Sequence, residues 1–264
     1  MPTTAPLPHG LRLSPSSRSV FKTLSRLSRA SLISLALGWL EESNLALCMP
    51  YVVGDVEDED DEDGTAPYGA AQSVEELREV YAELQARKGT KREIVDRIVE
   101  GDWRNGISMY QLAMAETRYL LDHASAQRWN ALRLTRAGTK DDWTHSIGDD
   151  GNDMSHLPRF HAQSFLLNLQ REVAPVTRAH YYLSPVKSMP ITLLRVYIHD
   201  SPYNTQRSLQ DVSEFKQKGS GDGSNSIFVV FPDGSPYVYV SIASNQGQAS
   251  GSESRSLRKV VLDV

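Results

Sequence analysis

The nine residues ITLLRVYIH, at positions 191–199, decide the fold class that we expect for this chain. In an extended chain Leu194, Val196 and Ile198 share one face, and Arg195, Tyr197 and His199 share the other. This alternation has a period of two and predicts a β-strand, whereas the preceding half of the chain has the 3.6-residue period of helices.

Further strands are expected on both sides of this segment. SIFVVF (226–231) and PYVYVSI (236–242) read as two strands joined by the turn Pro232-Asp233-Gly234, which suits a hairpin. An earlier strand is expected around 178–184, and helices are expected at about 157–173 and from about Ser254 onwards. Residues 157–264 are therefore predicted to be an α+β domain with a mainly antiparallel sheet, truncated at its C-terminus.

The first half of the chain reads as a bundle of helices. Ser16 or Ser17 can cap a helix that runs to about Leu27, and Ser73 opens a capping box with Glu76. Further helices are expected at 29–43, 90–101, 107–122 and 124–134, and the helix that begins at Ser73 should end near Lys88. We expect a helical domain over 1–137 with an acidic, disordered insertion at about 54–72, followed by a polar linker over 138–156.

The charge of the chain is concentrated in that insertion. The formal net charge of the 264 residues is −5, but DVEDEDDED (55–63) holds eight acids, so the remaining residues carry +3. The one cysteine, Cys48, excludes an intramolecular disulfide and reads as an inert buried thiol. The uncharged run 30–40 is about half the length of a membrane-spanning helix, so no membrane partner is expected.

Motifs for catalysis or cofactor binding are absent from the sequence. The glycines at 219, 221 and 223 precede a strand, whereas a phosphate-binding loop precedes a helix. DDGNDMSH (149–156) lacks the residue order of a calcium loop, and His156 and His161 have the wrong spacing for two ligands on one helical face. We therefore predict no catalytic residues, no metal, no cofactor and no small-molecule substrate, so the protein is not expected to be an enzyme.

Basic residues form two clusters that could face phosphate. In SRSVFKTLSRLSR (17–29) a helix places its cations within about 80° of one another, opposite Val20, Phe21, Leu24 and Leu27. ARKGTKR (86–92) supplies a second cluster at a helix junction. Two such clusters in a weakly charged chain favour phosphate binding over a merely solvated surface. The candidate phosphate-binding residues are Arg18, Lys22, Arg26, Arg29, Arg87, Lys88, Lys91 and Arg92.

A mitochondrial presequence is the alternative interpretation of the N-terminus. Residues 1–40 contain basic residues and many serines but no acid, as transit peptides do. Against this, cleavage near residue 40 would remove two helices from the predicted bundle. The alternative protein would be an imported mitochondrial one.

Several segments resemble the fungal branch of the centromere protein N (CENP-N) family, known from yeasts as Chl-four or Mis-fifteen. The resemblance begins with PTTAPLPHGLRLSPSSRSVFKTLSRLSRASLISLALGWL (2–40) and continues through RWNALRL (128–134) and FHAQSFLLNLQ (160–170). It extends to LLRVYIHDSPYNTQ (193–206) and IFVVFPDGSPYVYVSI (227–242). No catalytic signature is involved, so the resemblance depends on the order of these segments along most of the chain.

The resemblance implies an inner-kinetochore protein of the nucleus, with a pyrin-like helical domain followed by an α/β domain. Family members bind CENP-A nucleosomes and their DNA, and they pair with CENP-L through a C-terminal region. The family's DNA-facing positions match Lys22, Arg26, Lys91 and Arg92.

Two departures from the family pattern limit what carries over. Vertebrate members have acids at the start of the first helix, where this chain has Ser14 and Arg18, so DNA contact is expected rather than direct reading of the histone variant. The CENP-L region is expected to lie beyond Val264, which would make the chain an N-terminal fragment or a truncated gene model.

Overall fold

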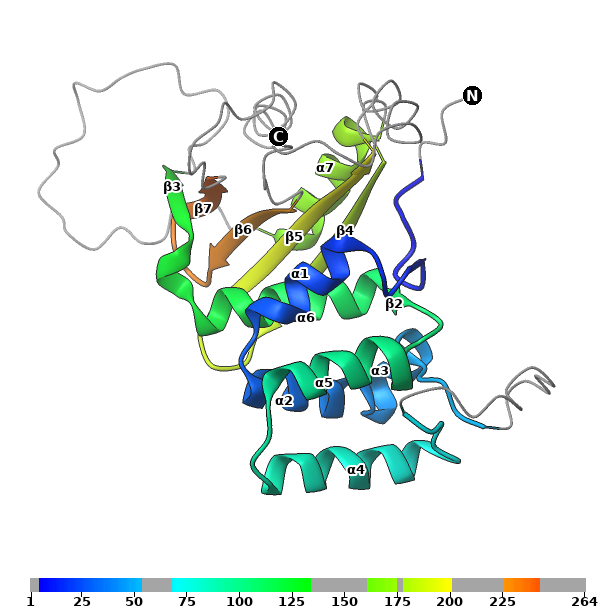
Figure 1. Cartoon of the computed structure of the whole chain (residues 1–264). Coiled ribbons are helices and arrows are strands. Elements are labelled where there is room, and N and C mark those ends of the chain that lie inside the picture. The colour runs from blue at the N-terminus through cyan, green and yellow to red at the C-terminus, as the bar shows by residue number, and fades with distance from the viewer. Residues whose placement is uncertain (1–4, 54–67, 134–160, 175–177, 201–225, 243–264) are drawn as a thin grey trace, which may run out of the picture. The chain divides into compact units, whose positions relative to one another are not determined.

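The structure, a computed structural model, describes residues 5–53, 68–133, 161–174, 178–200 and 226–242 (Figure 1). Its contacts divide the chain into two compact units. One unit is Pro8–Ala126, and the other combines Met1–Leu7 with Gln127–Val264. The first is built mainly of helices and the second around an antiparallel sheet, which confirms the predicted α+β class.

The helical unit contains six α-helices among its described residues. They are α1 (Arg18–Arg26), α2 (Arg29–Trp39), α3 (Glu42–Cys48), α4 (Val74–Ala86), α5 (Lys91–Asp96) and α6 (Met109–Asp122). The chain continues directly from α5 into a π-helix, η2 (Arg97–Asp102), and a single 3₁₀ turn, η3 (Ala124–Ala126), follows α6. Two short strands, β1 (Arg12–Leu13) and β2 (Ile107–Ser108), pair antiparallel.

Side-chain caps explain where most of these helices begin. Ser17 accepts a hydrogen bond from the Val20 N–H at the start of α1, and Ser73 accepts one from the Glu76 N–H at the start of α4. The capping box predicted at Ser73 forms only in part, because the Glu76 carboxylate accepts from the N–H of Gln72, one residue before the cap. The helix predicted over 29–43 divides into α2 and α3, because Leu40 and Glu41 lie between them as caps rather than helical residues.

The core of the helical unit is aromatic and apolar. Trp39, Tyr81 and Trp103 are fully buried, and the two indole rings meet edge to face with centroids 5.0 Å apart. The Trp103 Nε1–H donates to the Cys48 carbonyl at 2.7 Å, so the C-terminal end of α3 is fixed to the segment after η2. Cys48 is buried as predicted, and its burial raises the pKa of the thiol to about 12.

The second unit holds a five-stranded antiparallel sheet in the order β3-β7-β6-β5-β4. Helix α7 (Ala162–Val173) packs Leu166, Leu169 and Val173 into the apolar cluster of this sheet. The strands are β3 (Arg128–Arg133), β4 (Arg178–Val186), β5 (Ile191–Asp200), β6 (Ser226–Pro232) and β7 (Tyr237–Ile242). The predicted hairpin is confirmed, and Gly234 adopts the positive φ of 67° that its turn requires.

The helix predicted over 124–134 is wrong. Only Ala124–Ala126 makes a helical turn, and Arg128–Arg133 is strand β3, paired along its whole length with β7. Trp129 and Leu132 are three residues apart and imitate a helical stripe, but each is only half-buried and both lie in a sheet edge. Pairing with a distant strand therefore overrides the local period.

Other sequence predictions fall partly outside the described residues. These include the domain boundary at 137, the linker over 138–156, the glycine-rich loop and the helix from about Ser254, so each stays a prediction. Residues 68–72, expected to belong to the insertion, are described and make specific contacts. The Val53 N–H donates to the Ala71 carbonyl at 2.8 Å, and Val52 forms an isolated bridge with Ala71.

Candidate nucleic-acid interface

Helix α1 carries the first basic cluster. Val20, Leu24 and Leu27 are buried, whereas Arg18 and Arg26 are exposed and Lys22 is half-buried. The predicted division of the helix into an apolar and a basic side is therefore present, with one exception. Phe21, predicted on the apolar side, is 53% exposed, because the neighbouring helices do not cover this edge of α1.

The second basic cluster occupies the turn between α4 and α5. Arg87, Lys88, Lys91 and Arg92 are all exposed, and Thr90 caps α5 by accepting from the Glu93 N–H. Two of the cations have acidic neighbours: Arg87 pairs with Glu93, and Arg92 pairs with Asp96 at 3.3 Å. In both pairs the arginine is exposed and the carboxylate is half-buried. Each pair therefore lies at the surface, contributes about 0–1 kcal/mol and can be exchanged for a stronger anion.

The fold brings the two clusters together. Lys91 Nζ donates to the Ser25 carbonyl in the last turn of α1 at 2.7 Å, a contact between residues 66 positions apart. Arg29 Nη2 donates to the Leu84 carbonyl near the end of α4 at 2.5 Å. A Cβ added at Gly89 would lie 3.1 Å from that Arg29 Nη2, so the turn passes directly beside Arg29. The second cluster thus lies beside the C-terminal end of α1, which carries Arg26 and is followed by Arg29. We call the eight predicted cations the basic surface.

The members of the basic surface differ in how firmly the fold already engages them. Arg29 is half-buried and directed at a backbone carbonyl, which is a structural role. Lys91 uses one of its three donors at Ser25 and retains two. The guanidinium of Arg26 lies over the ring of Tyr119 on α6, 5.6 Å from its centroid, and is still exposed. Lys91 and Arg26 therefore present charge to solvent from positions that the fold holds in place.

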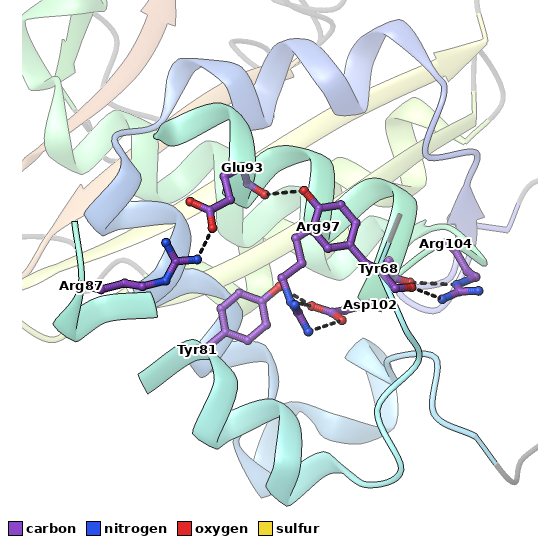
Figure 2. Close-up of polar contacts among 8 residues, drawn as sticks. Tyr68, Tyr81, Arg87, Glu93, Arg97, Asp102 and Arg104 are labelled. Carbon is purple, nitrogen blue, oxygen red and sulfur yellow. Dashed lines mark hydrogen bonds and ion pairs between the residues drawn. The ribbon is translucent and has the colours of Figure 1, made fainter. Parts of the chain in front are cut away.

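A buried polar network joins α4 to η2, the π-helix that continues α5 (Figure 2). The Asp102 carboxylate accepts from the Tyr81 hydroxyl at 2.7 Å and from Arg97 Nε at 3.0 Å. Burial raises the pKa of Asp102, and the charge of Arg97 opposes that shift. Because Tyr81 is on α4 and Arg97 follows α5 directly, the network fixes the two helices that flank the basic turn.

Tyr68 attaches the segment after the acidic run to the same region (Figure 2). Its hydroxyl contacts the Glu93 carbonyl at 3.5 Å, and its own carbonyl accepts from Arg104 Nη2 at 3.2 Å. The guanidinium of Arg97 lies 5.7 Å from the centroid of its ring. The chain therefore leaves the acidic segment along the side of α5 and η2.

Sequence reasoning missed that α6 borders the basic surface, through Tyr119 beneath Arg26. Arg118 is exposed on α6 and pairs with Asp122 at 3.0 Å, one residue before the Tyr119 that Arg26 covers. Its spacing of four residues from Asp122 is a recognisable helical ion pair, but no pattern in the sequence shows that α6 packs beside α1.

The described part of the chain lacks two other kinds of feature. Within it, no three His, Cys, Asp or Glu side chains are grouped so that they could hold a metal ion. Among the same residues, no helix is long and apolar enough to cross a membrane.

The described residues form a helical unit, in which Lys91 of the second basic cluster contacts the last turn of α1, and a unit built around an antiparallel sheet. The family model described as Centromere protein Chl4/mis15/CENP-N matches residues 14–264. The chain therefore belongs to the Chl4/mis15/CENP-N family, as the sequence resemblance predicts.

One curated relative extends this comparison. The chain is similar to the inner kinetochore subunit CHL4 of Saccharomyces cerevisiae (strain ATCC 204508 / S288c), with 22% identity over 172 residues. The match covers 61% of this chain and 34% of the yeast protein, so the chain is aligned with about a third of that relative.

Proposed function

We propose that this protein is a non-enzymatic adaptor of the inner kinetochore, which binds centromeric CENP-A chromatin through the DNA-facing basic surface. In this role it acts in the nucleus, at the centromere, and supports kinetochore assembly and chromosome segregation. Membership of the Chl4/mis15/CENP-N family supports the proposal, as does the similarity to a yeast protein named as an inner kinetochore subunit.

The observation that carries the proposal is the contact between Lys91 and Ser25. Without it, two short basic segments would each be an ordinary solvated surface. With it, cations from α1 and from the α4–α5 turn form one surface on a rigid support. A duplex presents one negative charge per about 1.7 Å of helix axis, so a continuous surface can neutralise several phosphates at once.

The chemistry of these cations favours contact with the DNA backbone. Arg18 and Arg26 on α1 and Lys91 and Arg92 on α5 are exposed cations that can donate to phosphate oxygens. The exposed pairs of Arg87 with Glu93 and of Arg92 with Asp96 can rearrange toward phosphate at little cost. Phosphate contacts position a protein without reading sequence, so we expect little base preference.

The alternative, a cleaved mitochondrial presequence, is disfavoured by the packing of the first 40 residues. Leu24, Leu32, Trp39 and Leu40 are each at most 1% exposed. Cleavage near residue 40 would remove α1 and α2 and leave the packed faces of α4, α5 and α6 open to water. Mass spectrometry of the natural N-terminus separates the two proposals, because a mature start near residue 40 would contradict the kinetochore role.

Our first prediction concerns the double substitution Lys22→Glu with Arg26→Glu. Phosphate contacts by four cations give a slope of log affinity against log salt of about −3.6, or about two orders of magnitude between about 50 and 200 mM. The four cations are Lys22, Arg26, Lys91 and Arg92. We expect the double variant to lose measurable binding near physiological salt and to flatten this slope, measured by fluorescence anisotropy with a duplex at three salt concentrations.

The matched control is Arg171→Glu with Lys187→Glu, which makes the same change of charge on exposed residues of the other unit. We expect it to bind nearly as the parent does. Melting curves should show that Lys22→Glu with Arg26→Glu destabilises the fold by less than about 1 kcal/mol, because neither side chain is in the packed stripe. Equal affinity of the parent and the folded double variant would refute DNA binding by this surface.

A further inference from the structure

Phe21 is the large apolar side chain on α1 that the helical bundle does not bury. It is 53% exposed, whereas Val20 and Leu24 on the same helix are 0% and 1% exposed. Singly exposed apolar residues are common on proteins and need no explanation by themselves. The surroundings of Phe21 are what make it unusual.

Polar and cationic residues border Phe21 on one side of the helix. By the period of the helix, Phe21 lies about 60° from Arg18 and about 40° from Ser25 around the axis of α1. Ser25 is the residue whose carbonyl receives the Lys91 ammonium at 2.7 Å. Phe21 therefore lies at the border of the basic stripe, with the buried Leu24 about 60° away on its other side.

We propose that Phe21 is the apolar contact of the basic surface on duplex DNA, packing against the deoxyribose faces that separate the phosphates along the minor-groove edge. The inference deepens the proposed function and depends on it. A duplex backbone alternates anionic phosphate with apolar sugar, and a surface that sets one exposed aromatic ring beside its cations is complementary to both. Apolar side chains at the minor groove are a known means of DNA contact, whereas Arg and Lys supply the phosphate contacts.

This contact has a thermodynamic signature that distinguishes it from the cationic contacts. A cation that neutralises a phosphate releases counterions, so its removal changes the slope of log affinity against log salt. Burial of an apolar ring releases no counterions, so its removal lowers the affinity without changing the slope. The two kinds of residue on one helix can therefore be separated in one titration series.

The experiment compares Phe21→Ala, Phe21→Leu and Lys22→Ala in the full chain, binding a mixed-sequence duplex at four salt concentrations. We expect Phe21→Ala to weaken binding about tenfold at every salt with an unchanged slope, and Phe21→Leu to retain most of the affinity. Lys22→Ala should reduce the magnitude of the slope by about 0.9. Because Phe21 is outside the core, all three variants should melt close to the parent.

The outcomes separate this inference from the proposed function. If the parent binds the duplex with a steep salt dependence and Phe21→Ala binds equally well, the sugar contact is refuted while the proposed function stands. If the parent shows no salt-dependent binding of the duplex, both are refuted. If Phe21→Ala weakens binding to a nucleosome but not to the free duplex, the ring contacts histone protein, and the DNA contact is refuted.

Discussion

At the scale of single residues, Asp102 shows how a buried charge can stabilise the support of an exposed site. Its side chain is 1% exposed and that of its partner Arg97 is 18% exposed, so the pair is largely removed from water. Tyr81, which is fully buried, donates its hydroxyl to the same carboxylate. Removing one partner of such a pair leaves an uncompensated buried charge, which is much more damaging than the loss of a surface pair.

We therefore predict an order of stability among three substitutions. Asp102→Ala should lower the free energy of unfolding by about 3 kcal/mol, because it strands both Arg97 and the Tyr81 hydroxyl. Tyr81→Phe keeps the ion pair and should lower it by about 1 kcal/mol. Asp96→Ala removes an exposed pair with Arg92 and should change it by less than about 1 kcal/mol. Urea unfolding measures all three, and a loss for Asp96→Ala as large as that for Asp102→Ala would show that burial is not the deciding factor.

At the scale of helices and strands, local signals account for what the sequence predicted correctly. Hydroxyl caps at Ser17 and Ser73, together with apolar stripes, identified helices that carry or flank the basic surface. Alternation over 191–199 identified β5, and Leu194 and Val196 are buried in the sheet core as expected. Each of these features depends only on residues that lie within a few positions of one another in the sequence.

The errors arise where distant segments decide. Arg128–Arg133 carries a helix-like spacing, but its pairing with β7, more than 100 residues away, makes it a strand. Phe21 is predicted on the apolar side of its helix, and only the packing of the neighbouring helices leaves it outside the core. The basic residues could be predicted as two clusters, but their convergence through Lys91 and Ser25 could not, since no local pattern links positions 66 apart.

Lys91 joins two helices, and this gives a prediction at the same scale. Its ammonium lies at the carbonyl end of α1, where the helix dipole favours a positive charge. We predict that Lys91→Ala lowers the free energy of unfolding by about 0.5–1 kcal/mol and reduces the magnitude of the salt slope for DNA by about 0.9.

Lys88→Ala is the matched control for Lys91, because Lys88 is exposed in the same turn and belongs to the same cluster. We expect it to leave the unfolding free energy unchanged, as measured by urea denaturation beside Lys91→Ala. If the two variants are equally stable, the contact with Ser25 does not hold α5 against α1 in solution.

At the scale of the whole molecule, the charges of the chain are separated rather than mixed. The eight acids of residues 55–63 give a net charge of −5 to a protein whose remaining residues carry +3. The segments on either side of the acidic run are held in the helical unit, through Val53 with Ala71 and through Tyr68 with Arg104. The run is therefore tethered to the same unit as the basic surface, and its local concentration there is high.

A tethered polyanion competes with DNA for cations, and this competition supplies our last prediction. Replacing the acids of residues 55–63 with serine and asparagine keeps the length of the segment and leaves the contacts at Val53 and Tyr68 intact. We expect this variant to bind duplex DNA a few-fold more tightly than the parent at low salt. The advantage should shrink as salt rises, since exposed charges farther apart than the Debye length of about 10 Å at 0.1 M are largely screened.

Anisotropy titrations across a salt series measure both effects, with melting curves to show that the fold is unchanged. Equal affinity at every salt would mean that the run acts only as a spacer, and weaker binding to nucleosomes by the neutral variant would mean that the acids contact histones instead.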